Sequence, residues 1–522
     1  MARINSNIPS LIAQANLGRA NQDLELRLER LSTGLRINRG SDDPAGLIIS
    51  ERLRGEIESV NQAIKNADRA SSVIATTESA LGEVNDLLIS IQSLLVEAAN
   101  VGAFSDEEIA ANQQQIDSAI ESITRIANTA TFGGLNLLDG SLDYTLSGVI
   151  GSQLSKVSVN EAGFFNQSSV SVDVDVINSA QTAQVFFGGI PANTGAIASS
   201  IELEIAGADG VTVLNFTSGT ALSSIANAIN QQSPSTGVEA ALINPADPTS
   251  GMVIRSADYG SDAFVSVGRL DYVNDATTPF GLSKFADGAT IPDFGPPFPW
   301  SDPNLQAVSG TAEINDDGSD VTALINGTLG RGKGLEVQLN TNGLGMNLLL
   351  NEDFATDPTA TSSNFTITGG GSLFQIGPEI NAQQQENIGI PSVAAERLGG
   401  TLINGSLEFL SSLKSGQGNS LAEAVDRGND FTASQNILDS AIDEISVLRG
   451  RLGAFERNVL DPSVRSMQTA FENLSSSVSR IRDADFAAET SALTRAQILA
   501  SSSTSVLGLA NQQSQTVLQL LG

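Results

Sequence analysis

One stretch of the chain, residues 44–100, constrains the fold more than any other. Its apolar residues recur at three- and four-residue spacing, and its one proline, Pro44, stands at its first position. Asp43 suits the N-cap, and Pro44 then falls where a helix needs no N–H donor. At 1.5 Å per residue such a helix is roughly 85 Å long. A rod of that length cannot be the core of one compact globule, so the sequence predicts partner helices along it.

Candidate partner helices stand on both sides of the middle of the chain. Ser105 and Glu108 form a capping-box pattern, and Phe104 with Ile109 is placed as a hydrophobic staple. This pattern predicts a second helix that ends near Ala130. Near the other terminus, residues 448–481 repeat the same apolar spacing. Pro462 interrupts that stretch and is expected to kink or break the helix.

The outermost ends carry a heptad seam of a different kind. It runs through the first 35 residues and again from about Ala492 to the C-terminus, and it is rich in Ala, Ser, Gly and Gln. Small side chains bury little area, and at about 25 cal/mol per Å² they stabilise an isolated helix pair weakly. We therefore expect helices that are marginal in one chain and ordered by other copies. The alternative is an ordinary amphipathic hairpin within one chain.

The middle of the chain, residues 141–400, reads as β structure because its apolar period is two. Residues 170–176 alternate Val with Ser or Asp, which indicates a half-buried strand. One short helix is expected at residues 221–232. Residues 291–303 hold five of the 16 prolines and are interpreted as a stiff linker between a first β-rich lobe, 141–290, and a second, 304–400. The predicted fold class is α+β: a long antiparallel helical coiled-coil bundle built from both termini, with inserted β-rich domains.

Composition excludes several classes of function. The chain has 522 residues, 27 Lys and Arg against 59 Asp and Glu, a net charge of −32, and no His or Cys. Zinc fingers, His-dependent nucleophile systems and disulfide frameworks are therefore unavailable. The negative field disfavours nucleic acid and anionic membranes as partners. No apolar run approaches a membrane span, and the first thirty residues lack a cleaved-signal pattern. We expect no catalytic, cofactor-binding or metal site.

Several long motifs resemble the terminal signatures of bacterial flagellin. They are LSTGLRINRGSDDPAGLIIS (31–50), LRGRLGAFERN (448–458) and SRIRDADFAAETSALTRAQIL (479–499). The resemblance covers about 140 residues at the N-terminal end and about 100 at the C-terminal end. In the middle, SGTALSSIANAIN with SADYGSDAFVSV is similar to the motif named for flagellin and hook proteins, and FQIGPEINAQQQENIGIPSV resembles a flagellin return segment.

The resemblance implies a structural subunit that polymerises into the helical, hollow flagellar filament for motility. Residues 1–40 with 490–522 would form the inner tube, and 41–140 with 420–489 the surrounding helical rod domain. The implied partners are further copies of the chain, the filament cap and junction proteins, an export chaperone and the type III export apparatus. The implied location is extracellular, in the filament, reached without a cleaved signal peptide.

Candidate assembly residues follow from the terminal seams, because a heterologous, non-closing interface generates a helical polymer. Three arginines are candidates for pairing across subunits with acids of the outer rods, the alternative being a solvated helix face. The complete candidate set is Leu24, Leu28, Leu31, Leu35, Leu499, Val506, Val517, Leu520, Arg30, Arg36 and Arg39.

Other interpretations remain open at this point. A hook–filament junction protein would share the terminal helices, and the β lobes could act as an adhesin or sheath. An enzyme would need a carboxylate pair that the spacing does not single out. Receptor-sensed flagellins carry Arg and Glu where this chain has Ser90, Gln92, Ser93 and Gln115, so we predict weak activation of the animal Toll-like receptor.

Overall fold

The structure is a computed structural model that places most of the chain. It describes residues 7–100, 102, 105–164, 167–188, 195–271, 281–286, 300, 302–307, 313–341, 343–357, 361–403 and 405–519, and the side chains of 514–519 are not described. By internal contacts the chain forms two units. The first comprises residues 1–71, 374–385 and 455–522, and the second comprises 72–373 and 386–454.

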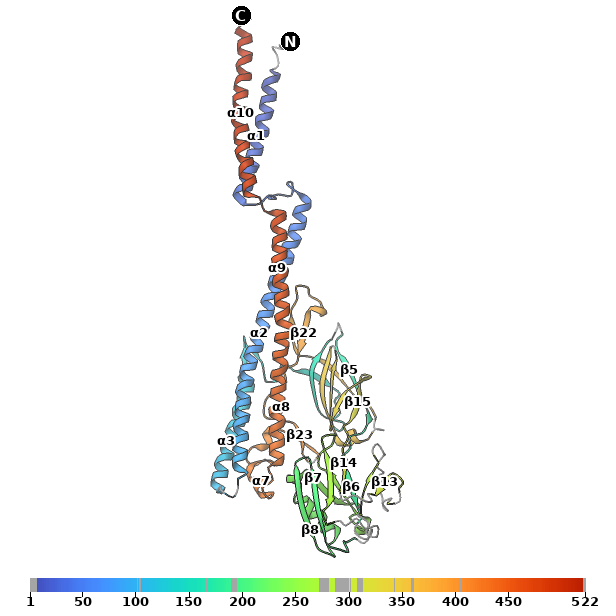
Figure 1. The fold of residues 1–522 in the computed structure, drawn as a ribbon. Helices are drawn as coiled ribbons and strands as arrows, with labels where there is room; N and C mark the ends of the chain where they lie inside the picture. Colours follow the sequence, from blue (N-terminus) through green and yellow to red (C-terminus); the bar gives the residue numbers. More distant parts are fainter. Residues whose placement is uncertain are drawn as a thin grey trace. The chain divides into compact units, whose positions relative to one another are not determined.

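Long helices come from both ends of the chain, as predicted (Figure 1). The Ser105–Glu108 capping box is present, whereas the proposed staple residue Phe104 lies outside the described residues. The helices are α1 (Ile8–Thr33), α2 (Pro44–Ala98), α3 (Asp106–Thr129), α7 (Leu421–Asp426), α8 (Thr432–Phe455), α9 (Asp461–Arg482) and α10 (Phe486–Gln519).

The apolar positions read from the sequence are the buried ones. In α2, Leu81, Leu88 and Ile91 are fully buried. Earlier in the same helix, Val60 and Ala67 pack with Met467 of α9 in one apolar cluster. Glu51 bonds Arg482, and Ser71 bonds Glu456, so α2 and α9 run antiparallel.

Pro462 changes the helix without breaking it. Residues Glu456–Leu460 form one π-helical turn immediately before α9, and Asp461 keeps right-handed helical dihedrals. A π turn widens the backbone by one residue, which accommodates a ring that has no N–H donor. The predicted interruption is therefore present as a local π turn, while the break is absent.

The β-rich middle divides differently from the two expected lobes. Strand β5 (Val170–Asn178) pairs with β15 (Thr322–Ile325) and β20 (Ser363–Gly370), which come from far beyond residue 290. Gln181 and Ser319 exchange backbone hydrogen bonds of 2.9 Å, so the chain leaves and re-enters one lobe at that point. The division at 290 is wrong because a sheet requires these distant strands to pair. We call residues 144–180 with 319–370 the host lobe and residues 181–318 the inserted lobe.

The host lobe packs two antiparallel sheets around one apolar core. Their strand orders are β16-β15-β5-β20-β3 and β17-β18-β19-β4. Val172 and Val174 of the predicted strand are fully buried in this core. The elements are β3 (Tyr144–Ser147), β4 (Leu154–Ala162), β5 (Val170–Asn178), β15 (Thr322–Ile325), β16 (Thr328–Leu329), β17 (Arg331–Lys333), β18 (Glu336–Thr341), β19 (Leu344–Leu350), α6 (Glu352–Thr356) and β20 (Ser363–Gly370).

The inserted lobe has its own core, to which the predicted short helix contributes as α4. Its sheets have the orders β13-β12-β6-β10-β9 and β14-β11-β7-β8. The elements are β6 (Gln184–Phe187), β7 (Ile201–Gly207), β8 (Gly210–Phe216), α4 (Leu222–Asn230), α5 (Ser233–Thr236), β9 (Val238–Leu242), β10 (Met252–Ser256), β11 (Phe264–Arg269), β12 (Leu282–Phe285), β13 (Leu305–Ala307) and β14 (Glu313–Asp317).

Most of the expected linker at 291–303 lies outside the described residues. Its flanking strands β12 and β13 pair with each other in one sheet of the inserted lobe. The segment therefore connects neighbouring strands of one lobe. Short strand pairs and turns complete the described fold: β1 (Thr131–Phe132), β2 (Leu135–Asn136), β21 (Ser372–Gln375), β22 (Gln385–Ile388), β23 (Thr401–Ile403) and β24 (Ser406–Glu408).

Within the second unit, polar side chains of α8 bind the host lobe to the helix. Glu444 pairs with Lys156 of β4 at 2.6 Å and accepts the Gly399 N–H at 2.8 Å. Arg451 donates to the Gly389 carbonyl at 2.7 Å and bonds the side chain of Asn160. Burial lowers the pKa of Arg451 from its usual value, so these acceptors compensate a partly desolvated cation.

Candidate assembly surfaces

The two terminal helices, α1 and α10, pack against each other as an antiparallel pair. Asn7 donates to the Ala510 carbonyl at 3.2 Å, and at the other end Arg27 pairs with Glu489 at 3.0 Å. The side chains buried between them are small, with Ala13 from α1 and Ala496 from α10 as the main apolar members. This pair, which we call the terminal hairpin, therefore buries little apolar area for its length.

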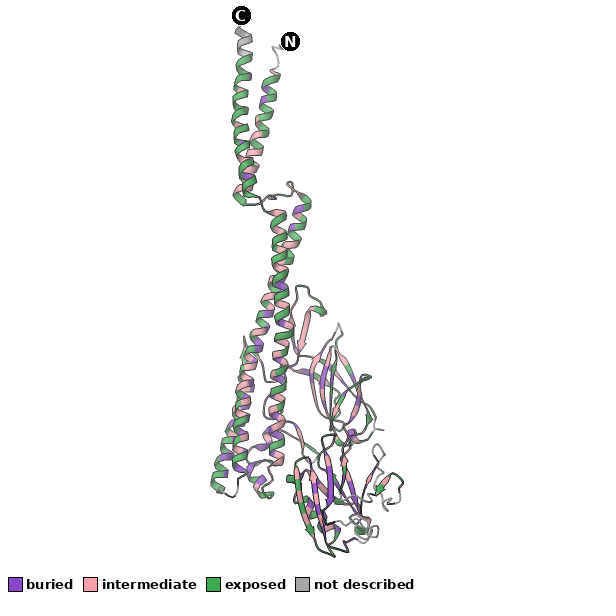
Figure 2. Cartoon of the chain, viewed as in Figure 1, coloured by how far each residue is buried: buried purple, intermediate pink, exposed green. Residues whose placement is uncertain are grey.

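Most residues of the terminal hairpin are exposed (Figure 2), and large apolar side chains are among them. Leu28 is 48% exposed, Leu499 is 49% exposed and Val506 is 51% exposed. The other large exposed apolar side chains of these helices are Ile8, Leu11, Ile12, Phe486, Ile498 and Leu509. Exposed large apolar side chains gathered on one element indicate a site of protein association.

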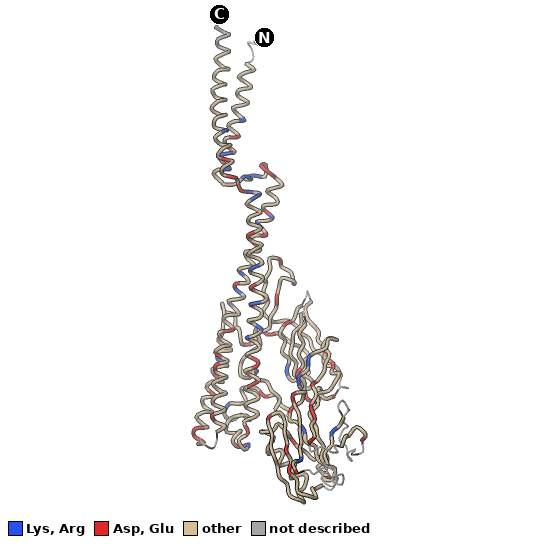
Figure 3. Tube along the Cα trace, in the orientation of Figure 1, with Lys and Arg blue, Asp and Glu red and all other residues tan. Residues whose placement is uncertain are grey.

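Charge is absent from the part of the terminal hairpin that lies away from Leu28 and Glu489. The sequence has no charged residue from 4 to 18 and none after Arg495, and Figure 3 shows the corresponding helix turns without charge. On these turns no charge repulsion opposes contact with an identical chain. The terminal hairpin thus differs from the rest of a strongly acidic chain.

The sequence-predicted leucines and valines divide into two groups. Leu24, Leu31 and Leu35 are half-buried within the chain, whereas Leu28, Leu499 and Val506 are exposed. Of the remaining two candidates, Val517 lies in α10 with an undescribed side chain, and Leu520 lies outside the described residues.

The three candidate arginines all have partners within the chain. Arg30 pairs with Glu489 at 3.2 Å. Arg36 donates to the Ile481 carbonyl at 2.6 Å, and Arg39 pairs with Glu29 at 3.0 Å. Only Arg30 is partly buried; Arg36 and Arg39 remain exposed to solvent despite these contacts.

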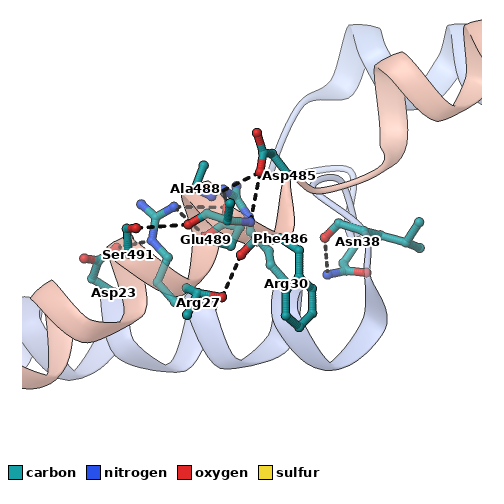
Figure 4. Close-up of polar contacts among 12 residues, drawn as sticks. Asp23, Arg27, Arg30, Asn38, Asp485, Phe486, Ala488, Glu489 and Ser491 are labelled. Atoms are coloured by element: carbon teal, nitrogen blue, oxygen red, sulfur yellow. Dashed lines mark hydrogen bonds and ion pairs between the residues drawn. The ribbon is translucent and has the colours of Figure 1, made fainter.

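Glu489 is the residue at the base of the terminal hairpin that the sequence reasoning missed (Figure 4). It is 8% exposed and accepts hydrogen bonds from both Arg27 and Arg30. Burial alone would raise its pKa, but the two guanidinium groups outweigh burial and lower it. The one signal in the sequence was that Glu489 is the last acidic residue, ahead of a segment with a single charge.

A short backbone ladder joins the terminal hairpin to the next helix pair. Ala484 N–H donates to the Gly34 carbonyl at 2.9 Å, and Arg36 N–H donates to the Arg482 carbonyl at 2.6 Å. Gly34 ends α1 with φ +73°, a left-handed conformation that glycine adopts without strain. These bonds therefore join the connection between α1 and α2 to the connection between α9 and α10.

Among the described residues, no helix is long and apolar enough to cross a membrane, and no cluster of three His, Cys, Asp or Glu side chains is placed to hold a metal ion. A cleft of about 690 Å³ lies between the host and inserted lobes and is lined by acidic and polar side chains, including Glu239, Asp258 and Asp320. It contains no constellation that identifies a reaction.

Comparison with known proteins gives matches over the whole chain. Residues 4–143 match the bacterial flagellin N-terminal helical region, 435–521 the bacterial flagellin C-terminal helical region, and 202–258 the flagellin hook IN motif. The chain is 29% identical over 519 residues to B-type flagellin of Pseudomonas aeruginosa, covering 99% of each chain. It is 27% identical over 553 residues to flagellin of Salmonella typhimurium, again covering 99% of each.

Solved structures match less closely. Hook-associated protein-3 of Legionella pneumophila is 12% identical with a TM-score of 0.29, covering 83% of this chain and 98% of that one. The flagellar cap protein domains of Escherichia coli are 14% identical with a TM-score of 0.26, covering 65% of this chain and 96% of that one.

Proposed function

The chain belongs to the bacterial flagellin family and is a subunit of the flagellar filament, and on that premise we propose that its terminal hairpin is the principal assembly interface. The observation that carries this proposal is the inverted burial of the hairpin, with small side chains inside and Leu28, Leu499 and Val506 outside. Neighbouring copies would cover these side chains, so assembly would complete a core that one chain leaves open.

The energetic argument favours association over an isolated hairpin. Fully burying one Leu or Val side chain is worth about 1.5–3 kcal/mol, of which a half-exposed side chain has gained roughly half. Three such side chains per copy therefore leave several kcal/mol to be gained on contact, before the entropy lost on association. A contact that repeats from copy to copy without closing generates a helical polymer.

We assign distinct layers to the helix pairs on the same premise. Residues 1–40 with 490–522 would form an inner tube, and 41–140 with 420–489 the surrounding rod domain. Glu489 would hold the inner helices in register through Arg27 and Arg30, while Leu24, Leu31 and Leu35 support the hairpin. Val517 and Leu520 stay candidates from the sequence. The host and inserted lobes would take no part in this contact.

The partners and location proposed here follow from membership of a filament-forming family. They are the filament cap and junction proteins, an export chaperone and the type III export apparatus, with the assembled filament outside the cell. Flagellin is a structural protein family, and we propose no enzymatic activity. The full-length relatives named above are flagellins, so no observation favours the junction-protein, adhesin or sheath interpretations.

The test replaces exposed apolar side chains of α10 and measures polymerisation. Leu499→Lys with Val506→Lys places charges in the proposed contact, while Ser501→Lys with Thr504→Lys places the same charges on exposed positions of the opposite face of the helix. We expect folded monomers that fail to extend sheared filament seeds for the first pair and normal extension for the control pair. Deleting 490–522 should likewise give soluble, non-polymerising monomers. Normal filaments from the first pair would refute the interface.

A further inference from the structure

Strand β8 forms one edge of a sheet in the inserted lobe (Figure 1). All seven of its residues, Gly210–Phe216, pair with β7 on one side. An edge strand presents a row of backbone donors and acceptors on its other side, which is a template for a further strand. Proteins protect such edges with charged side chains, proline, bulges or short strands.

β8 lacks these protections. No charged residue and no proline occurs from 210 to 217, and the pairing with β7 runs without a register shift. The other long edges carry charge: β14 has Glu313 and β4 has Lys156. Among the edge strands in the described part of the chain, β8 alone combines more than four residues with no charged side chain.

Apolar side chains are left open on both faces of β8. On one face Val211 is 63% exposed and Val213 is 42% exposed. On the other face Leu214 and Phe216 pack against the core but are only partly buried, whereas Leu203 opposite Leu214 in β7 is fully buried. The side chains of a further strand alongside β8 would pack against these apolar side chains on each face.

We propose that β8 pairs antiparallel with β8 of a second copy of this chain that belongs to a neighbouring filament. β8 itself carries no charge, and Glu202 and Glu204 lie one strand farther from the contact, in β7. In a chain of net charge −32, an identical β8 therefore meets less repulsion here than a charged edge of the same chain would. Full overlap of the two strands sets Val213 opposite Val213 and Val211 opposite Asn215. This two-fold contact joins different filaments, because copies within one filament are related by a helical operation and share one direction.

A single strand pair is a small contact, below the roughly 1,200 Å² of a stable interface. Free subunits should therefore pair weakly, whereas filaments that present many copies side by side should associate by avidity. The proposal goes beyond the assembly interface and uses none of its residues. It also implies that salt strengthens filament association, because salt screens the repulsion between acidic surfaces.

The absence of cysteine from the chain allows a register-specific crosslinking test. Val213→Cys places two thiols opposite each other, with Cα atoms about 4.5–5.5 Å apart, which suits a disulfide. Val211→Cys is the matched control: its side chain is more exposed, but its own copy lies four residues away, about 13 Å along the strand. The double variant Val211→Cys with Asn215→Cys should again crosslink.

After mild oxidation of filaments, we expect covalent dimers from Val213→Cys at least tenfold above those from Val211→Cys. Val213→Lys should also reduce filament bundles collected at low speed. The lysine of this variant should not disturb the fold, because Glu204 of β7 lies opposite position 213 and can pair with it. Equal crosslinking of the two single-cysteine variants in normal filaments would overturn the proposal. Loss of high-speed pelleting would instead count against the terminal hairpin, so the two failures are distinguishable.

Discussion

Removing the negative charge of Glu489 should weaken the terminal hairpin, and Glu489→Gln is the cleanest perturbation of it. The carboxylate accepts bonds from Arg27 at 3.0 Å and from Arg30 at 3.2 Å and is 8% exposed. A hydrogen bond to a charged group contributes about 1.5–3 kcal/mol to stability. Because Arg27 is partly solvated, we expect the substitution to cost roughly 1–2 kcal/mol in total.

Which assay reports this loss of stability depends on whether the hairpin is ordered in the free subunit. Where the free subunit lacks an ordered hairpin, the loss raises the critical concentration for seeded polymerisation by about 5- to 30-fold. Where the free subunit already forms the hairpin, the loss lowers the thermal stability of its helical circular dichroism signal. The control is Glu25→Gln, which removes the same charge from an exposed position of α1. Equal behaviour of the two variants in both assays would refute the role assigned to Glu489.

The remaining predictions concern other parts of the chain. Because the pKa of Glu489 is lowered in the folded hairpin, its stabilisation is present at neutral pH and should be lost as pH falls below about 4.5 through that lowered pKa, an effect absent from Glu489→Gln. Arg451→Met should lower the thermal unfolding temperature of the subunit through a loss of about 2–3 kcal/mol, with the exposed Arg457→Met as control and calorimetry as the measurement. Burial raises the pKa of Tyr144 to about 12, so the folded subunit should lose stability between pH 10 and 12, and Tyr144→Phe should reduce that loss in urea titrations. The purified subunit should activate a Toll-like receptor reporter cell weakly, and strong signalling would contradict the inference from Ser90, Gln92, Ser93 and Gln115.

The helical part of the fold was readable from the sequence because it depends on local patterns. The Ser105–Glu108 capping box acts within one turn, and the period of 3.6 residues alone identifies Leu88 and Ile91 as buried. The strand at 170–176 was also predicted from a local pattern, the alternation of Val with Ser or Asp. The lobe division failed because it depends on pairing between β5 and β20, which are almost two hundred residues apart and share no local signal.

The assembly surface was predicted only in part for a related reason. The heptad spacing grouped Leu499 and Val506 with Ala496, but in the hairpin Ala496 faces α1 and the other two face outward. A heptad pattern of apolar residues predicts that a helix has a partner, but the pattern is the same whether the partner belongs to the same chain or to another copy. Glu489 was missed because an ion pair between residues 27 and 489 is set by the antiparallel register of two distant helices.

A reconstruction of the seeded filament by electron cryomicroscopy tests the central claim most directly. The account predicts a hollow polymer in which Leu28, Leu499 and Val506 are buried by neighbouring copies and the terminal hairpins line the central channel. A filament in which these three side chains remain exposed to solvent, or in which the lobes alone hold the copies together, would contradict the account.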